Sequence, residues 1–176
     1  MASMTENRGI ALLFGTLCLA GAVALAQEPP LNISSAKHPH LAAAQQEARH
    51  AWDKLVEAQK ANDWDMQGNA QKAKDMLVQV NQQLKAAADA ANTNGANKKS
   101  GGPTGQPPAA NISAQRHPHL AAAQQLSRQA WQKMVEAQQA NDWDMEGHAQ
   151  HAKEMLVQVM KDLKAAALAA NAGAHH

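Results

Sequence analysis

The sequence is poor in aromatic residues and nearly devoid of cysteine. Phe, Trp and Tyr together make up 3% of the 176 residues, and tyrosine is absent. This scarcity of large side chains argues against a thick globular core. The one cysteine, Cys18, lies in a segment that we expect to be removed. Disulfides, thiolate metal sites and cysteine nucleophiles are therefore excluded from the mature protein.

The chain also lacks a surplus of charge and the usual catalytic signatures. Its formal net charge is +1, and its lysines are interleaved with acidic residues, so we expect no nucleic-acid partner. It has no Gly-rich phosphate loop and no HExxH motif. Glu57 and Glu136 are the carboxylates considered as general acids, but we expect them to be solvated residues on exposed helix faces. The sequence thus predicts a protein without enzymatic activity.

A long apolar run occurs only near the N-terminus. The run from Ile10 to Ala26 follows Arg8 and ends in Ala24-Leu25-Ala26, a small-x-small pattern typical of signal-peptide cleavage. An uncleaved anchor would need about 20 apolar residues, more than this interrupted run provides. We therefore predict a signal peptide over 1–26 and an exported protein, periplasmic or secreted, that has no membrane association after cleavage.

What the chain does contain is a tandem repeat. Residues 32–92 recur as residues 111–171, and 44 of the 61 aligned positions are identical. Such identity over a whole unit indicates duplication of a structural module. A short lead, 27–31, precedes the first repeat, and a tail, 172–176, follows the second. The segment between them, 93–110, is rich in Gly, Pro and Asn, which predicts a flexible linker.

Each repeat has the pattern of a helical hairpin. Pro39 and Pro118 suit the first turn of a helix, which we expect to continue to Ala61 in the first repeat. The second helix is expected to run from Asp63, as N-cap, to Asn92. Small and apolar residues recur at steps of three and four, as in a coiled-coil seam. These seam residues are Leu41, Ala44, Ala48, Ala51, Leu55 and Ala58 in the first helix, and Met66, Ala70, Ala73, Leu77, Val80, Leu84, Ala87 and Ala91 in the second.

Two residue types stand out within this pattern. Gly68 and Gly147 fall inside the expected second helices, at a cost of about 1 kcal/mol relative to alanine. Either the glycine was copied with the repeat, or a neighbouring backbone approaches closely there. The tryptophans are expected to be packing anchors between the hairpins rather than a ligand platform. They are Trp52, Trp64, Trp131 and Trp143.

A single hairpin of about 60 residues buries too little surface to be comfortably stable, so we expect the two repeats to pack together or to pair with other chains. A flexible linker of 18 residues spans about 24 Å, whereas each second helix is about 40 Å long. This comparison favours hairpins that lie side by side with their open ends together. The predicted fold is all-α: two tandem antiparallel helical hairpins, coiled-coil-like and joined by a flexible linker, that pack as an up-down four-helix bundle.

These features predict an exported structural or interaction protein that needs no cofactor. It would bind a partner protein, or its own copies as a homo-oligomer, through the heptad seams. The histidines support an alternative function, the binding of Zn or Cu, because imidazole is a good ligand for both metals. Three candidate metal sites follow from their positions: His38 with His40; His148 with His151; and a four-residue site of His117, His119, His175 and His176 at the end of the second repeat.

Overall fold

The computed structural model of the chain describes residues 27–61, 66–93, 106–141 and 145–173. The predicted signal peptide, the predicted N-cap Asp63, Trp64 and Trp143, and His175 and His176 lie outside these ranges. The described residues form four long helices and two short 3₁₀ turns, and they contain no strand. In chain order these elements are α1 (Pro39–Ala61), η1 (Met66–Gly68), α2 (Asn69–Thr93), α3 (Pro118–Asn141), η2 (Met145–Gly147) and α4 (His148–Gly173).

The starts of α1 and α3 agree with the prediction from the sequence. Both helices begin at a proline, whose missing N–H is not needed in the first turn. A turn leads into each of them, in which the backbone N–H of His38 donates to the carbonyl of Ser34 and that of His117 to the carbonyl of Ser113, both at 2.9 Å. The end of α1 at Ala61 was also predicted.

The second helix of each hairpin begins later than predicted, because a left-handed turn precedes it. In η1, Met66, Gln67 and Gly68 have φ values of 54°, 55° and 73°, which no right-handed helix allows. The placement of Gly68 inside the second helix is therefore wrong, and so is the close approach of a neighbouring backbone that was one of its two explanations. A Cβ atom placed on Gly68 would meet nothing within 4 Å, so no backbone approaches closely there. Glycine suits this position because it adopts a positive φ at little cost.

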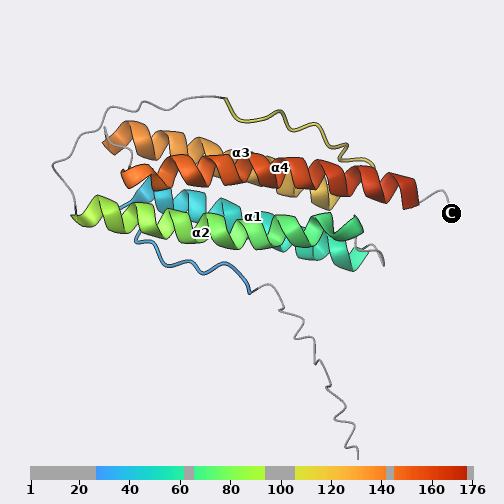
Figure 1. Cartoon of the computed structure of the whole chain (residues 1–176), viewed down its shortest axis with the longest axis horizontal. Coiled ribbons are helices and arrows are strands. Elements are labelled where there is room, and N and C mark those ends of the chain that lie inside the picture. Colours follow the sequence, from blue (N-terminus) through green and yellow to red (C-terminus); the bar gives the residue numbers. More distant parts are fainter. Residues whose placement is uncertain (1–26, 62–65, 94–105, 142–144, 174–176) are drawn as a thin grey trace, which may run out of the picture.

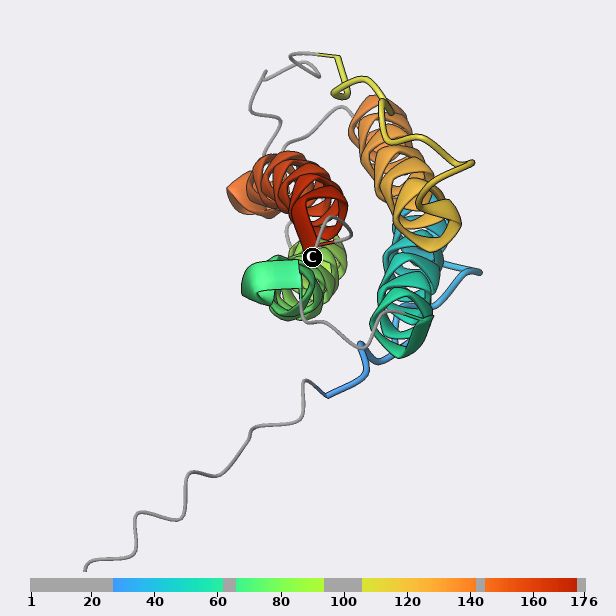
Figure 2. The same cartoon turned by 90° about the vertical axis from the view of Figure 1, so that its right-hand side faces the viewer.

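The helices form a four-helix bundle, as predicted. Figure 2 shows two layers, one made of α1 and α3 and the other of α2 and α4, so that each layer takes one helix from each repeat. The predicted seam residues fill the space between the layers. Leu41, Leu55, Leu77 and Leu84 are at most 1% exposed, and so are their copies in the second repeat. The seams of the two repeats therefore share one core.

The relative orientation of the two hairpins differs from the prediction. Figure 1 shows the open end of the first hairpin, where α1 starts and α2 ends, beside the turn of the second hairpin, so the open ends lie at opposite ends of the bundle. The contacts agree, since the start of α1 meets the end of α3 through His40 and Glu136. The expectation of open ends together was wrong because it took 18 residues in a compact coil as the linker. The 24 residues between Thr93 and Pro118, when extended, reach along the whole bundle.

None of the described helices is long and apolar enough to cross a membrane.

Candidate functional site

A histidine closes the open end of each hairpin. The imidazole Nε2 of His38, just before α1, lies 3.2 Å from Oδ1 of Asn92 near the end of α2. Its copy His117 makes the same contact to Asn171 of α4, at 3.0 Å. The first His of each His-Pro-His motif is thus used to join the two helices of its own hairpin.

The second His of each motif joins the two repeats instead. His40 Nδ1 lies 2.9 Å from Oε2 of Glu136 on α3, and Lys133 donates to the same carboxylate at 2.8 Å. The copy of this trio lies at the other end of the layer, where His119 Nδ1 is 2.9 Å from Glu57 Oε2. Lys54 completes it with a bond of 2.7 Å to Glu57. Two identical contacts, each linking a residue to the copy of its partner, define an approximate two-fold axis between the repeats.

The carboxylates of these trios are held in their ionised form. The hydrogen bond and the charge of Lys54, with a smaller contribution from His119, lower the pKa of Glu57 below its usual value of 4.5. Lys133 and, to a smaller extent, His40 do the same to Glu136. Both carboxylates had been assigned only to solvated faces. A signal was present in the sequence, since His40, Lys54 and Glu57 are all identical in the second repeat while many exposed neighbours are not.

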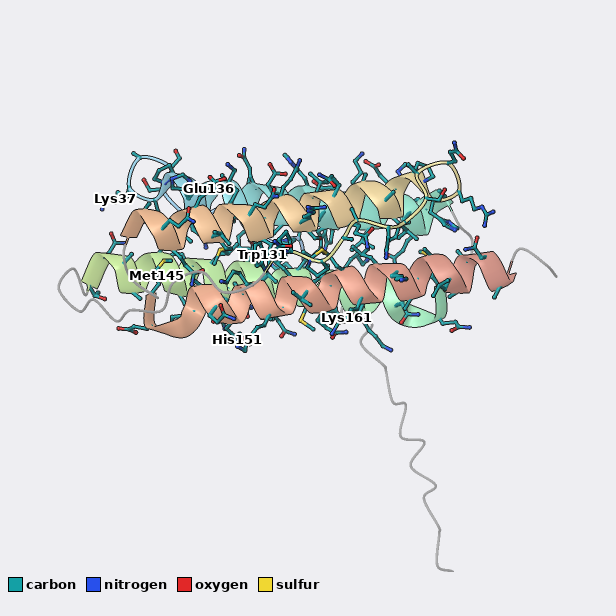
Figure 3. All side chains as sticks on the ribbon, turned by 90° about the horizontal axis from the view of Figure 1, so that it is seen from above. Lys37, Trp131, Glu136, Met145, His151 and Lys161 are labelled. Carbon is teal, nitrogen blue, oxygen red and sulfur yellow. The ribbon has the colours of Figure 1, made fainter. Side chains whose placement is uncertain are left out.

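The predicted metal-binding histidines are distributed over separate contacts. His38 and His40 contact different helices, α2 and α3. His148 Nδ1 lies 2.8 Å from Oε1 of Gln83 on α2, whereas His151 is exposed on the outer side of α4 (Figure 3). No three His, Cys, Asp or Glu residues within the described ranges are grouped as metal ligands. The tail site depends on His175 and His176, which lie outside those ranges.

A lysine lies over a tryptophan in the groove between the two helices of each hairpin. Lys153 Nζ is 5.4 Å from the centre of the Trp131 ring, which lies between α3 and α4 (Figure 3), and Lys74 is 5.6 Å from that of Trp52. Trp131 is 5% exposed and Lys153 only 1%. Burial lowers the pKa of Lys153, whose Nζ has no hydrogen-bond partner. The two described tryptophans thus pack within hairpins as well as against the common core.

The lead segment before α1 lies along the groove between α1 and α2. The side chains of Gln45, Arg49 and Asn81 bind residues 28–33, which include most of the lead and the first two residues of the repeat, by hydrogen bonds and one ion pair. In the second repeat, Gln124 binds the backbone N–H groups of Asn111 and Ile112 in the same way. No role was predicted from the sequence for residues 27–33 or for Asn111 and Ile112, because these contacts form only in the tertiary structure.

Comparison with protein-family models, with curated protein sequences and with solved structures finds no match for this chain. The function is therefore argued from the contacts described above.

Proposed function

We propose that this protein is an exported, non-enzymatic structural or interaction protein whose binding surfaces are the seams of its two helical hairpins. The observation that carries the proposal is the burial of each seam against the other repeat. Leu77 and Leu156, at the middle of the two seams, have no exposed surface. A seam that binds a second hairpin within the chain has the shape and chemistry to bind a like hairpin from another chain.

The two-fold relation supports self-recognition in particular. The interface uses the same patch on both repeats, because His40 contacts Glu136 just as His119 contacts Glu57. Most core positions are also identical in the two repeats; Ala48 and Leu55, replaced by Ser127 and Met134, are exceptions. Hairpins from two chains would therefore find nearly the same complementary surface as the two hairpins of one chain. We propose a second copy of the protein as the partner.

The export part of the proposal rests on the apolar run before Gln27. The intact mass of the protein recovered outside the cytoplasm should correspond to a chain that begins at Gln27. A recovered chain that still carries residues 1–26 would contradict this address.

A shortened linker tests the self-recognition. Deletion of residues 94–110 leaves seven residues between Thr93 and Pro118, which reach at most about 25 Å. The two ends are separated by roughly the length of α2, about 37 Å for 25 residues. The hairpins of one chain then cannot pair with each other in this arrangement. We expect the variant to form a dimer, measured by light scattering after size exclusion, in which two chains exchange hairpins.

The matched control replaces residues 94–110 with a Gly-Ser segment of the same length and should form less dimer than the deletion variant at the same concentration, because its hairpins can also pair within one chain. A helical, monomeric deletion variant would contradict the proposal, because its two seams would then be satisfied in some other way. An aggregated or unfolded deletion variant would contradict it as well, since the seams would have failed to find each other between chains.

A further inference from the structure

The groove between α1 and α2 is a second recognition surface, distinct from the seam. It holds the lead, residues 27–31, together with Asn32 and Ile33 of the first repeat, and this extended lead runs along the first hairpin (Figure 1). Pro29 is buried and Ile33 is half-buried, while Gln27, Glu28 and Leu31 are exposed. Because most of its residues face solvent, the lead is a surface segment rather than part of the shared core.

One buried side chain, that of Gln45, binds the C-terminal half of the lead. Gln45 is 1% exposed, and both ends of its amide are used. Its Oε1 accepts the backbone N–H groups of Asn32 and Ile33 at 2.8 and 3.0 Å. Its Nε2 donates to Oδ1 of Asn32 at 2.9 Å. Without a segment in the groove this amide would be left buried and unsatisfied, which costs about 1–3 kcal/mol, so the groove requires an occupant.

Two further side chains, those of Arg49 and Asn81, bind the N-terminal half of the lead. Arg49 pairs with the carboxylate of Glu28 and donates from Nη1 to the carbonyl of Pro29 at 3.0 Å. From the opposite wall, Asn81 donates to the carbonyl of Pro30 at 3.3 Å. These contacts favour an acidic residue followed by two residues whose carbonyls point to the two walls. Proline suits both positions, since it favours an extended backbone and its missing N–H needs no partner.

The equivalent groove of the second hairpin, between α3 and α4, lacks some of these contact residues. Gln124 accepts the backbone N–H groups of Asn111 and Ile112, so both grooves bind the chain before the first helix through a glutamine amide. The position of Glu28 is taken by Pro107, however, and that of Asn81 by Met160. Selection of an acidic segment is therefore a property of the first groove. The second groove, with Arg128 at the position of Arg49, supplies a matched control within the same molecule.

The lead leaves a pocket of about 340 Å³ between itself and α1, and Leu31 at its edge is 54% exposed. The pocket is lined by residues within 31–46 alone, so it opens on the α1 side of the groove. The pocket walls are mostly apolar or uncharged: Leu31, Ile33, Ser35, Pro39, Ala42, Ala43, Gln45 and Gln46. A segment with a larger apolar side chain at the position of Leu31 would bury more surface there than the lead does.

We propose that the groove between α1 and α2 binds an extended segment of a partner protein, with the lead as its intramolecular occupant. The segment carries an acidic residue, two prolines, a large apolar residue, an asparagine and an aliphatic residue, in that order. The partner segment displaces the lead and takes over its polar contacts with Gln45, Arg49 and Asn81. This site is independent of the seams, so it stands whether or not the hairpins bind a second copy.

Fluorescence anisotropy with a labelled peptide of residues 27–34 tests the site. The acceptor is the mature chain with residues 28–32 replaced by glycine and serine, and a milder acceptor carries Glu28→Gln and Asn32→Ala. We expect both to bind the peptide with a Kd below about 1 mM. The unaltered chain should bind at least about tenfold more weakly, because its tethered lead competes at a millimolar effective concentration. A peptide with Leu31→Phe should bind several-fold more tightly.

Arg49→Gln in either acceptor should weaken binding about tenfold, as expected for the loss of a charge-assisted contact. Arg128→Gln, the same change in the second groove, should leave the Kd unchanged. Equal effects of the two substitutions would overturn the assignment to the first groove. Absence of binding up to 1 mM by both acceptors, with helical content equal to that of the unaltered chain, would overturn the proposal. Weaker binding of the Phe peptide would overturn the assignment of the pocket.

Discussion

Single polar residues join the two repeats in equivalent pairs. His40 with Glu136 and His119 with Glu57 are half-buried contacts near the surface, and each carboxylate also accepts a hydrogen bond from a lysine of its own helix. Exposed ion pairs are individually weak, typically 0–1 kcal/mol. They can still select one orientation of the hairpins, because the apolar seam residues are common to both repeats. The lowered pKa values of Glu57 and Glu136 make this selection dependent on pH.

The double variant Glu57→Gln and Glu136→Gln should be less stable than the unaltered protein at pH 7, and the difference should be smaller at pH 3. Both carboxylates have pKa values lowered by hydrogen bonds, so their stabilisation is present above about pH 4.5 and is lost as the pH falls through the lowered values. Urea midpoints at the two pH values measure the difference. Glu47→Gln on α1, outside both trios, is the control. A difference of equal size at pH 3 would show that packing, not charge, is responsible.

Lys153→Met should stabilise the protein. Lys153 is buried without a hydrogen-bond partner, and its pKa is lowered by that burial, so the charged amine is kept at a cost that its contact with Trp131 offsets only in part. We expect a gain of about 1 kcal/mol, seen as a rise of a few degrees in Tm. Lys74→Met, at the half-buried copy, should have a smaller effect. A lower Tm for Lys153→Met would mean that the contact with Trp131 outweighs desolvation.

At the scale of elements, the helices follow from local signals in the sequence, whereas the turns between them do not. Pro39 and Pro118 mark helix starts because their ring fixes φ, and the three-to-four spacing of seam residues marks the buried face. The left-handed turns at Met66 and Met145 were missed, because the seam period continues through both methionines, which are fully buried at the end of the core. Only the glycine two residues later gave a signal, and it was interpreted as helical.

Gly68→Ala decides between the two interpretations of this glycine. In a helix the change would stabilise the protein by about 1 kcal/mol. At a φ of 73° it should instead destabilise by about 1 kcal/mol, since a Cβ atom disfavours the left-handed region. Gly68→Asn should cost less than Gly68→Ala, because asparagine tolerates positive φ better. Denaturant midpoints provide the comparison, and a midpoint above that of the unaltered protein for Gly68→Ala would contradict the left-handed turn.

At the scale of the whole molecule, the sequence predicts four helices around one core but not how the hairpins face each other. Both orientations bury the same seams, so hydrophobic periodicity does not distinguish them. The distinction comes from contacts such as His40 with Glu136, which require a register between α1 and α3. The candidate surfaces divide in the same way. The His-Pro-His motifs stand out in the sequence, where they were candidates for metal binding, a role that stays a prediction. Their contacts with Asn92 and Glu136 and the groove around Gln45 depend on tertiary packing.

The antiparallel arrangement of the two hairpins, with their open ends at opposite ends of the bundle, is tested most directly by a distance between two equivalent residues. The contact of His148 with Gln83 places the two-fold axis between α2 and α4 near Met76. Asp89 on α2 and its copy Leu168 on α4 are both exposed, and each lies thirteen residues beyond the axis in opposite directions. Spin labels on cysteines introduced at these two positions, in a chain that begins at Gln27 and so lacks Cys18, should be about 40 Å apart, at 1.5 Å per residue, when measured by pulsed electron resonance. A main distance below about 20 Å would place the open ends together and contradict the antiparallel arrangement of the hairpins.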